Sequence, residues 1–293
     1  MNELRGAGVA LVTPFNTDGT VDFESLARLI DFQINKGMNY LVVLGTTGET
    51  ATLTAAERKQ VWMFASKQVN GRLPLVAGIG GNNTQEIVEQ VKDFAIAGYC
   101  AILSVSPYYN KPTQEGIYQH YKAIALASKL PLILYNVPGR TGSNMSPATT
   151  IRLAKDFQNI VATKEASGSF SQFNELMRDK PTDFLLISGD DPITLPMMAI
   201  GAVGIISVVG NAYPAEVAEL TRLCTAADFV TARTLHNQLL EITQLCFTEA
   251  NPCGVKYILQ EKGIINTDAV RLPLVPVTTT SQEAIKAELL KLG

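Results

Sequence analysis

The chain contains eight short apolar runs, and their number and spacing limit the possible folds more than any other feature of the sequence. Each run is rich in Val, Ile and Leu, and each is followed by a small or polar loop and then by a segment with helical spacing. The runs span residues 8–15, 40–47, 74–80, 101–107, 132–137, 160–165, 184–189 and 204–210. Near-continuous apolar strands that alternate with helices indicate a parallel sheet covered by helices. Eight such units close a (β/α)8 TIM barrel.

Helix boundary signals lie between the runs. Asp22 is placed to cap a helix, Thr54 and Glu57 have capping-box spacing, and Ser146 precedes Pro147 in the order typical of a first helical turn. After the eighth run the pattern changes to successive helices over about residues 214–263, then a proline-rich connector over 271–281 and a final helix over 282–292. We expect a barrel over 1–227 and a C-terminal helical domain over 228–293.

Composition excludes several classes of function. The net charge is -3 and the chain has no basic run, so it lacks the positive electrostatic potential that attracts a phosphate backbone. This argues against a nucleic-acid partner. The first apolar run is short and interrupted by Pro14, so it is not a signal peptide, and no run approaches the roughly 18 apolar residues of a membrane span. The four cysteines show no paired spacing. These features predict a cytoplasmic protein with free thiols.

Candidate catalytic residues are expected at the ends of the runs, because the active site of a TIM barrel lies at the C-terminal ends of its strands. The sixth run ends in Lys164 and Glu165, within "IVATKEASG". By itself, that stretch is also compatible with a solvent-exposed lysine at the end of a strand, without a catalytic role. The two histidines, His120 and His236, lie in helical segments, which disfavours a metal site or a histidine-based triad. The amine of Lys164 is the strong nucleophile that remains.

A lysine nucleophile forms a Schiff base with a carbonyl substrate and needs hydroxyl groups to move protons when histidine is missing. Tyr135, Thr47 and a tyrosine of "SPYYN" fit that need. The hydroxyls and amides of Thr46 and Thr47 suit one substrate carboxylate, and the guanidinium of Arg140 suits a second.

Over essentially its whole length the chain resembles the dihydrodipicolinate synthase family, within the class I pyruvate-dependent aldolases that also include N-acetylneuraminate lyase. The matching motifs are "GVALVTPF", "GTTGE", "SPYYNKPTQEGIYQHYKAIA", "LPLILYNVPGRTG", "KEASG", "ISGDD", "NPCGVKYIL" and "RLPLVPVT". The resemblance implies that pyruvate condenses with L-aspartate 4-semialdehyde on the route to diaminopimelate and lysine. It also implies that no cofactor is needed beyond an imine with the enzyme.

Residue by residue, the resemblance implies that Lys164 forms the Schiff base and that Tyr135 is the proton-handling phenol. Thr47 and Tyr109 match the rest of the hydroxyl relay, and in the family that second tyrosine crosses a subunit interface of a homotetramer built from two tight dimers. The implied substrate-binding positions are Thr46 and Thr47 for the pyruvate carboxylate, Arg140 for the semialdehyde carboxylate, and Gly189 and Ile206 as pocket-lining backbone.

A site for feedback inhibition by lysine is matched in part. The compatible positions are Thr50, Ala51, Asn82, Glu86 and Tyr108. Ala55 and Arg58 stand where a lysine-sensitive pattern has histidines, and Asn82 and Glu86 also suit an ordinary helix start. Regulation by lysine is therefore left open at this stage.

Three other functions are compatible with parts of the pattern. A different Schiff-base aldolase, such as N-acetylneuraminate lyase or a keto-deoxy sugar-acid aldolase, would keep Lys164 but would not need Arg140. A non-catalytic barrel that senses a keto acid would not need the full set of lysine, phenol and threonines. A phosphate-binding barrel would need a glycine-rich cradle after the last strands, where "SGDD" and "VVGNAYP" stand instead.

Overall fold

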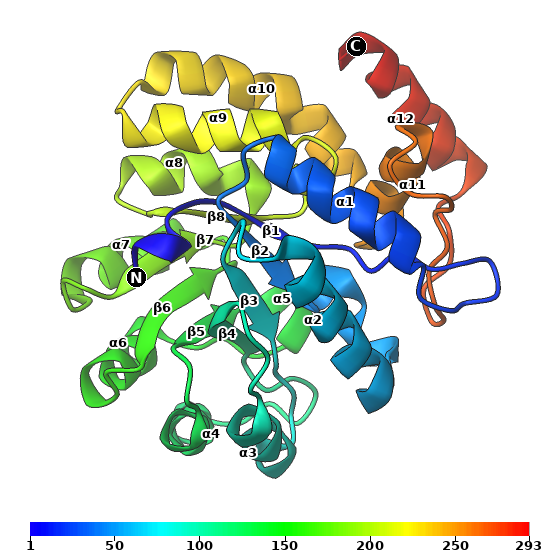
Figure 1. Cartoon of the computed structure of the whole chain (residues 1–293). Coiled ribbons are helices and arrows are strands. Elements are labelled where there is room, and N and C mark those ends of the chain that lie inside the picture. The colour runs from blue at the N-terminus through cyan, green and yellow to red at the C-terminus, as the bar shows by residue number, and fades with distance from the viewer. Residues whose placement is uncertain (293) are drawn as a thin grey trace.

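A computed structural model describes residues 1–292 and confirms the predicted (β/α)8 barrel (Figure 1). Eight parallel strands close in sequence order, and β8 pairs with β1. The strands are β1 (Gly6–Ala10), β2 (Tyr40–Val43), β3 (Leu75–Gly78), β4 (Tyr99–Val105), β5 (Leu132–Asn136), β6 (Ile160–Glu165), β7 (Leu185–Ser188) and β8 (Gly204–Ser207).

Helices surround the strands on the outside of the barrel, and short 3-10 turns lie at several strand ends (Figure 1). The helices of the barrel are α1 (Phe23–Asn35), α2 (Ala55–Val69), α3 (Thr84–Asp93), α4 (Gln114–Ala127), α5 (Pro138–Thr141), α6 (Pro147–Asp156), α7 (Phe170–Asp179), α8 (Thr194–Ala199) and α9 (Pro214–Thr225). The 3-10 turns are η1 (Asn2–Leu4), η2 (Thr46–Gly48), η3 (Thr50–Thr52), η4 (Asp191–Ile193) and η5 (Val209–Asn211).

The helix starts that the sequence predicted are present with their capping bonds. The Asp22 carboxylate accepts a bond of 2.9 Å from the Ser25 amide. Thr54 and Glu57 form both bonds of the capping box, and Ser146 caps α6 with Pro147 in the first turn. Each cap satisfies amide groups that the first helical turn leaves unpaired, so it defines where the helix begins after β1, β2 and β5.

The bounds of several elements differ from the prediction: β2 ends at Val43 rather than 47, β8 ends at Ser207 rather than 210, and the first strand and the last helix also differ. β1 covers residues 6–10 rather than 8–15, because the chain leaves the ladder after Ala10 while remaining buried. In this segment the Thr13 hydroxyl donates to the Gly48 carbonyl, and Phe15 makes an isolated bridge to Val21. An apolar run therefore marks burial here rather than a strand. The final helix, α12 (Thr279–Leu292), begins at 279 rather than 282.

The core has an inner and an outer layer. Side chains from all eight strands fill the barrel interior, including Ala10, Tyr40, Val42, Val76, Leu103, Ile133, Tyr135, Ala162, Ile187 and Ile206. The opposite faces of the strands pack against the helices in a second, larger cluster. Side chains alternate between the two layers along each strand, so Lys164 shares the interior face with Ala162.

After α9 the chain forms α10 (Phe229–Leu245), α11 (Cys253–Glu261) and α12, which lie to one side of the barrel (Figure 1). The border between the predicted parts 1–227 and 228–293 falls in the turn between α9 and α10. Their division into two domains stays a prediction. Within residues 1–292, no helix combines the length and apolar character needed to cross a membrane.

Candidate active site

Lys164 lies inside the barrel near the C-terminal end of β6, and only 5% of the residue is exposed. The strand register pairs it with Tyr135 of β5, and its Nζ lies 4.4 Å from the centroid of the Tyr135 ring. The pKa of Lys164 is lowered to about 8, mainly by burial and also by the charge of Arg140, while the charges of Asp191 and Asp190 oppose the shift. At neutral pH a useful share of this amine is therefore unprotonated.

The absence of a side chain at Gly189 leaves the space that the Lys164 side chain occupies. A Cβ atom at this position would lie 2.9 Å from both Cγ and Cε of Lys164, closer than such carbon atoms approach. The Gly189 amide bonds the Glu165 carbonyl at 2.9 Å, which holds the glycine backbone beside the end of β6. A glycine is therefore required for close packing against the amine, and the family-implied position coincides with this contact.

Tyr135 and Arg140 lie in sequence at the end of β5 and in the short helix α5 that follows it. Burial raises the pKa of Tyr135, while the charge of Arg140 and the neighbouring Thr46 hydroxyl oppose the rise. A hollow of about 40 Å³ is lined by Tyr135 and Thr46, among others. A larger cavity of about 330 Å³ is lined by Thr46 and by the exposed Arg140. The phenol and the guanidinium thus line two hollows that share Thr46.

The two threonines of η2 are placed differently from each other. Thr46 lines both hollows and lies close to Tyr135. Thr47 is buried, lines neither hollow, and accepts a bond of 3.0 Å from the Asn251 amide. Thr46 is thus the threonine beside Tyr135, and the predicted relay role of Thr47 stays a prediction.

Tyr109 does not join this cluster within the single chain. Its side chain is 88% exposed, and its backbone has a φ of 70° in the left-handed region that favours glycine. The preceding Tyr108 lines the larger cavity, and its carbonyl accepts a bond from the Asn82 amide. The loop after β4 therefore projects one tyrosine outward and turns the other toward the mouth.

Asp191 has a structural position that the sequence did not predict. Asp191 opens the 3-10 turn η4. Its buried carboxylate also accepts bonds from the Ser207 hydroxyl at 2.5 Å and from the Val208 amide at 2.8 Å. β7 and β8 share only one registered pair, so this carboxylate links their C-terminal ends close to the interior residue Ile206.

Glu165, for which the sequence identified no partner, faces the helices and is fully buried. It accepts bonds from the side-chain amides of Asn136 at 3.1 Å and Gln172 at 3.0 Å, and from the Ser167 amide at 2.8 Å. Burial raises its pKa, and these donors oppose that rise. The carboxylate thereby ties the loop after β6 to β5 and α7, directly beside Lys164.

The residues expected at a lysine site do not lie together: four of them line two different hollows, and Asn82 lines neither. Thr50, Ala51 and Tyr108 line the cavity of about 330 Å³ together with Arg140. Glu86 instead lines a hollow of about 420 Å³ between α2 and α3, with Ala55 and Arg58.

The arrangement favours attack by the amine on a carbonyl carbon. It contains a buried nucleophile, a phenol and a hydroxyl for proton transfer, and a guanidinium facing the open cavity. Among residues 1–292, no three His, Cys, Asp or Glu side chains cluster as metal ligands would.

Comparisons with known proteins show the family of the chain. The sequence model of the dihydrodipicolinate synthetase family matches residues 3–292. A protein of Parabacteroides distasonis named 4-hydroxy-tetrahydrodipicolinate synthase is 52% identical over 290 residues, which cover 99% of this chain and 97% of the relative. A protein of the same name from Chloroherpeton thalassium is 49% identical, covering 99% of this chain and 96% of the relative.

Solved structures match equally well. The dihydrodipicolinate synthase of Aquifex aeolicus is 41% identical with a TM-score of 0.95, covering 98% of each chain. The chloride-inhibited enzyme of Acinetobacter baumannii, solved in complex with pyruvate, is 43% identical with a TM-score of 0.95, covering 99% of each chain. A structure described as a monomeric dihydrodipicolinate synthase variant is 38% identical with a TM-score of 0.96, covering 100% of this chain and 98% of that one. By sequence and by structure, this chain belongs to the dihydrodipicolinate synthetase family.

Proposed function

We propose that this chain is a carbon–carbon bond-forming lyase of the class I aldolase type, with 4-hydroxy-tetrahydrodipicolinate synthase activity on pyruvate and L-aspartate 4-semialdehyde. The names of relatives about half identical over nearly the whole chain support this activity. The observation that carries the proposal is the buried amine of Lys164, whose pKa is lowered to about 8 beside the Tyr135 ring.

In the proposed reaction, the free amine of Lys164 attacks the carbonyl carbon of pyruvate to give a carbinolamine. Loss of the hydroxyl group as water leaves an imine, which withdraws electrons and lets one methyl proton depart. The resulting enamine carbon attacks the aldehyde of the second substrate, whose oxygen takes up a proton. The amino group of the adduct then attacks the imine carbon, closes the ring and releases Lys164. No cofactor takes part.

Protons must reach the departing oxygen and later the aldehyde oxygen, and Tyr135 is the proposed donor beside the amine. Its raised pKa keeps the phenol protonated at neutral pH, which suits a donor. We assign the second hydroxyl of the relay to Thr46 rather than Thr47, because Thr46 lies beside Tyr135 and lines both hollows.

Tyr109 is proposed to complete the relay in a second subunit. Its 88% exposure at the tip of a strained loop supports a role outside its own barrel. This assignment goes with a homotetramer of two tight dimers, which stays a prediction.

The two substrate carboxylates are assigned to separate groups. The hydroxyl of Thr47 and the amides of η2 suit the carboxylate of pyruvate, with Gly189 and Ile206 as backbone lining. Arg140 faces the larger cavity and suits the carboxylate of the semialdehyde. The cytoplasmic location also stays a prediction. Feedback by lysine at Thr50, Ala51, Asn82, Glu86 and Tyr108 is the least supported assignment, since Glu86 lines a separate hollow.

A coupled assay with both substrates tests the proposal, run with and without lysine. Wild-type enzyme should turn over, and Lys164→Met should lose turnover at least 1000-fold, on the order expected when a covalent nucleophile is removed. Arg140→Ala should raise the KM for the semialdehyde, while the pyruvate imine still forms, changed only through the pKa of Lys164. Turnover of a polyhydroxylated sugar acid that is indifferent to Arg140→Ala would instead identify a sugar-acid aldolase.

A further inference from the structure

The loop that carries Thr46 and Thr47 has an unusual backbone. Leu44 and Glu49, on either side of it, have φ values of 61° and 53°, in a region that side-chain-bearing residues avoid. Such strain persists only where surrounding contacts impose it. The contacts that hold this loop should therefore be identifiable around Glu49.

Glu49 is held by residues more than 200 positions further along the chain. Its side chain and that of Lys256 in α11 are 1% and 0% exposed, and the Lys256 Nζ donates to the Glu49 Oε1 at 2.5 Å. The second carboxylate oxygen accepts from the Arg271 amide at 3.0 Å. Lys256 also donates to the Ala269 carbonyl at 2.8 Å. A fully buried pair whose two partners also bond the backbone fixes the geometry of the groups it joins.

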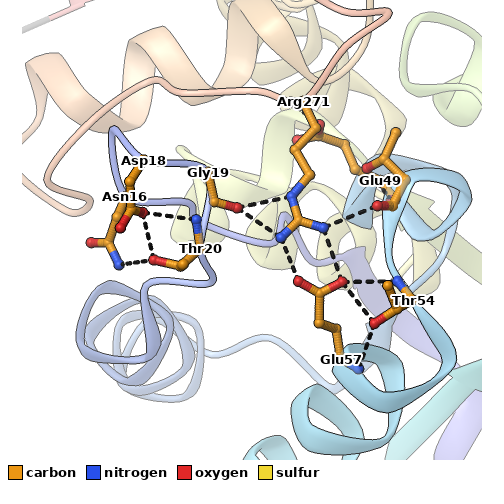
Figure 2. A network of polar contacts seen from close by, with 9 residues as sticks. Asn16, Asp18, Gly19, Thr20, Glu49, Thr54, Glu57 and Arg271 are labelled. Atoms are coloured by element: carbon orange, nitrogen blue, oxygen red, sulfur yellow. Dashed lines mark hydrogen bonds and ion pairs between the residues drawn. The ribbon is translucent and has the colours of Figure 1, made fainter.

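Arg271 extends the same connection (Figure 2). Its guanidinium donates to the Glu57 carboxylate at the start of α2 and to the carbonyls of Thr52 and Gly19. Glu57 in turn closes the capping box with Thr54. The segment after Glu49 is thus anchored at both of its ends by one residue of the C-terminal connector.

Asn251 contacts Thr47 directly. The residue is 8% exposed and lines the cavity of about 330 Å³, and its Nδ2 donates to the Thr47 hydroxyl oxygen. This bond occupies a lone pair of the hydroxyl, so the Thr47 hydrogen must be donated elsewhere. Within residues 1–292 it has no acceptor, and a substrate carboxylate would supply one.

We propose that Asn251, Lys256 and Arg271 are positioning residues that hold the Thr46–Thr47 loop in the conformation that binds the keto acid. The inference rests on the proposed function, because it assigns these contacts to pyruvate binding. It means that the active site is not contained in residues 1–227, since three of its supports come from the C-terminal segment.

The test replaces the buried pair by neutral residues of similar volume, Glu49→Gln with Lys256→Met. A neutral, well-packed replacement of a buried ion pair is often close to neutral for stability, whereas either single change leaves a buried charge unpaired. The double variant should remain folded yet need about ten-fold more pyruvate for half-maximal borohydride trapping. The control, Glu288→Gln with Lys291→Met, makes the same two changes in an ion pair of α12 whose lysine is 69% exposed, and it should trap like wild type.

A second variant keeps the test decisive if the double variant does not fold. Asn251→Ala should raise the half-saturating pyruvate concentration roughly three- to ten-fold, as loss of one hydrogen bond does. In a protein that already carries Thr47→Val, Asn251→Ala should change the half-saturating pyruvate concentration less than two-fold, because the two residues act through one hydrogen bond. Equal effects on both backgrounds, or folded variants that all trap pyruvate like wild type, would overturn the inference. Wild-type enzyme that forms no imine would refute the proposed function instead.

Discussion

The pH dependence of imine formation follows from the burial of Lys164. With a folded pKa of about 8 the free amine makes up roughly 10% of the total at pH 7, against roughly 0.03% for an ordinary lysine with a pKa near 10.5. Burial therefore increases the reactive form roughly 300-fold at pH 7. The rate at low pyruvate should rise ten-fold per pH unit below about 8 and level off above it.

Two variants should move this profile in opposite directions. The charge of Asp191 raises the pKa of Lys164, so Asp191→Asn should shift the plateau to lower pH. The charge of Arg140 lowers it, so Arg140→Met should shift the plateau to higher pH. Both shifts are measured by rapid mixing with pyruvate, quenching with borohydride and quantifying the modified protein by mass spectrometry.

Two results would refute this reasoning. A rate that continues to rise ten-fold per unit through pH 10 would mean that the amine keeps its ordinary pKa despite its position. Shifts of the same sign in both variants would mean that the neighbouring charges do not act on Lys164. Thermal melts of each variant at each pH control for unfolding.

Further predictions concern stability and substrate binding. Lys164→Met should be inactive yet more stable than wild type at pH 7, by up to roughly 3 kcal/mol in urea unfolding. An amine whose folded pKa lies below its unfolded pKa lowers the stability of the fold until the pH exceeds both values. Equal or lower stability of the variant would contradict this prediction. Gly189→Ala should slow borohydride trapping of pyruvate at least ten-fold while the protein stays folded, since the new methyl group displaces the Lys164 side chain. An unchanged rate of trapping would show that the Lys164 side chain can move aside without losing its reactivity. Burial lowers the pKa of His120 to about 4 from 6.5, so the unfolded state takes up the proton first and stability should fall by roughly 3 kcal/mol between pH 6.5 and 4. That loss should be reduced in His120→Gln, as measured by urea unfolding across this range.

The sequence was sufficient to predict the barrel and the position of its amine. Eight apolar runs separated by capped helices have few alternatives, and strand parity places Lys164 with Ala162 on the inner face. The same parity directs Glu165 outward, as observed. Its partners were not predictable, because Asn136 and Gln172 approach it only through the packing of β5 and α7.

The roles of Thr46 and Thr47 could not be separated from the sequence. The two-residue alternation ends with β2, and the left-handed Leu44 and the 3-10 turn η2 then rotate the side chains by amounts that no period describes. Only the observed contacts with Tyr135 and Asn251 distinguish them.

The contribution of the C-terminal segment had one sequence signal. Lys256 lies within the otherwise mostly apolar "CGVKYIL", and a charge in such a stretch needs a buried partner. The sequence does not say which of the 27 carboxylate-bearing residues that partner is, because Glu49 is some 200 positions away. Contacts over such separations depend on the completed fold.

The most direct test of the account is to identify the residue that pyruvate modifies. Wild-type protein is incubated with isotopically labelled pyruvate, reduced with borohydride, digested and sequenced by mass spectrometry. The account predicts stoichiometric label on Lys164 alone, and no label in Lys164→Met. Label on another lysine, or stoichiometric label that persists in Lys164→Met, would contradict it.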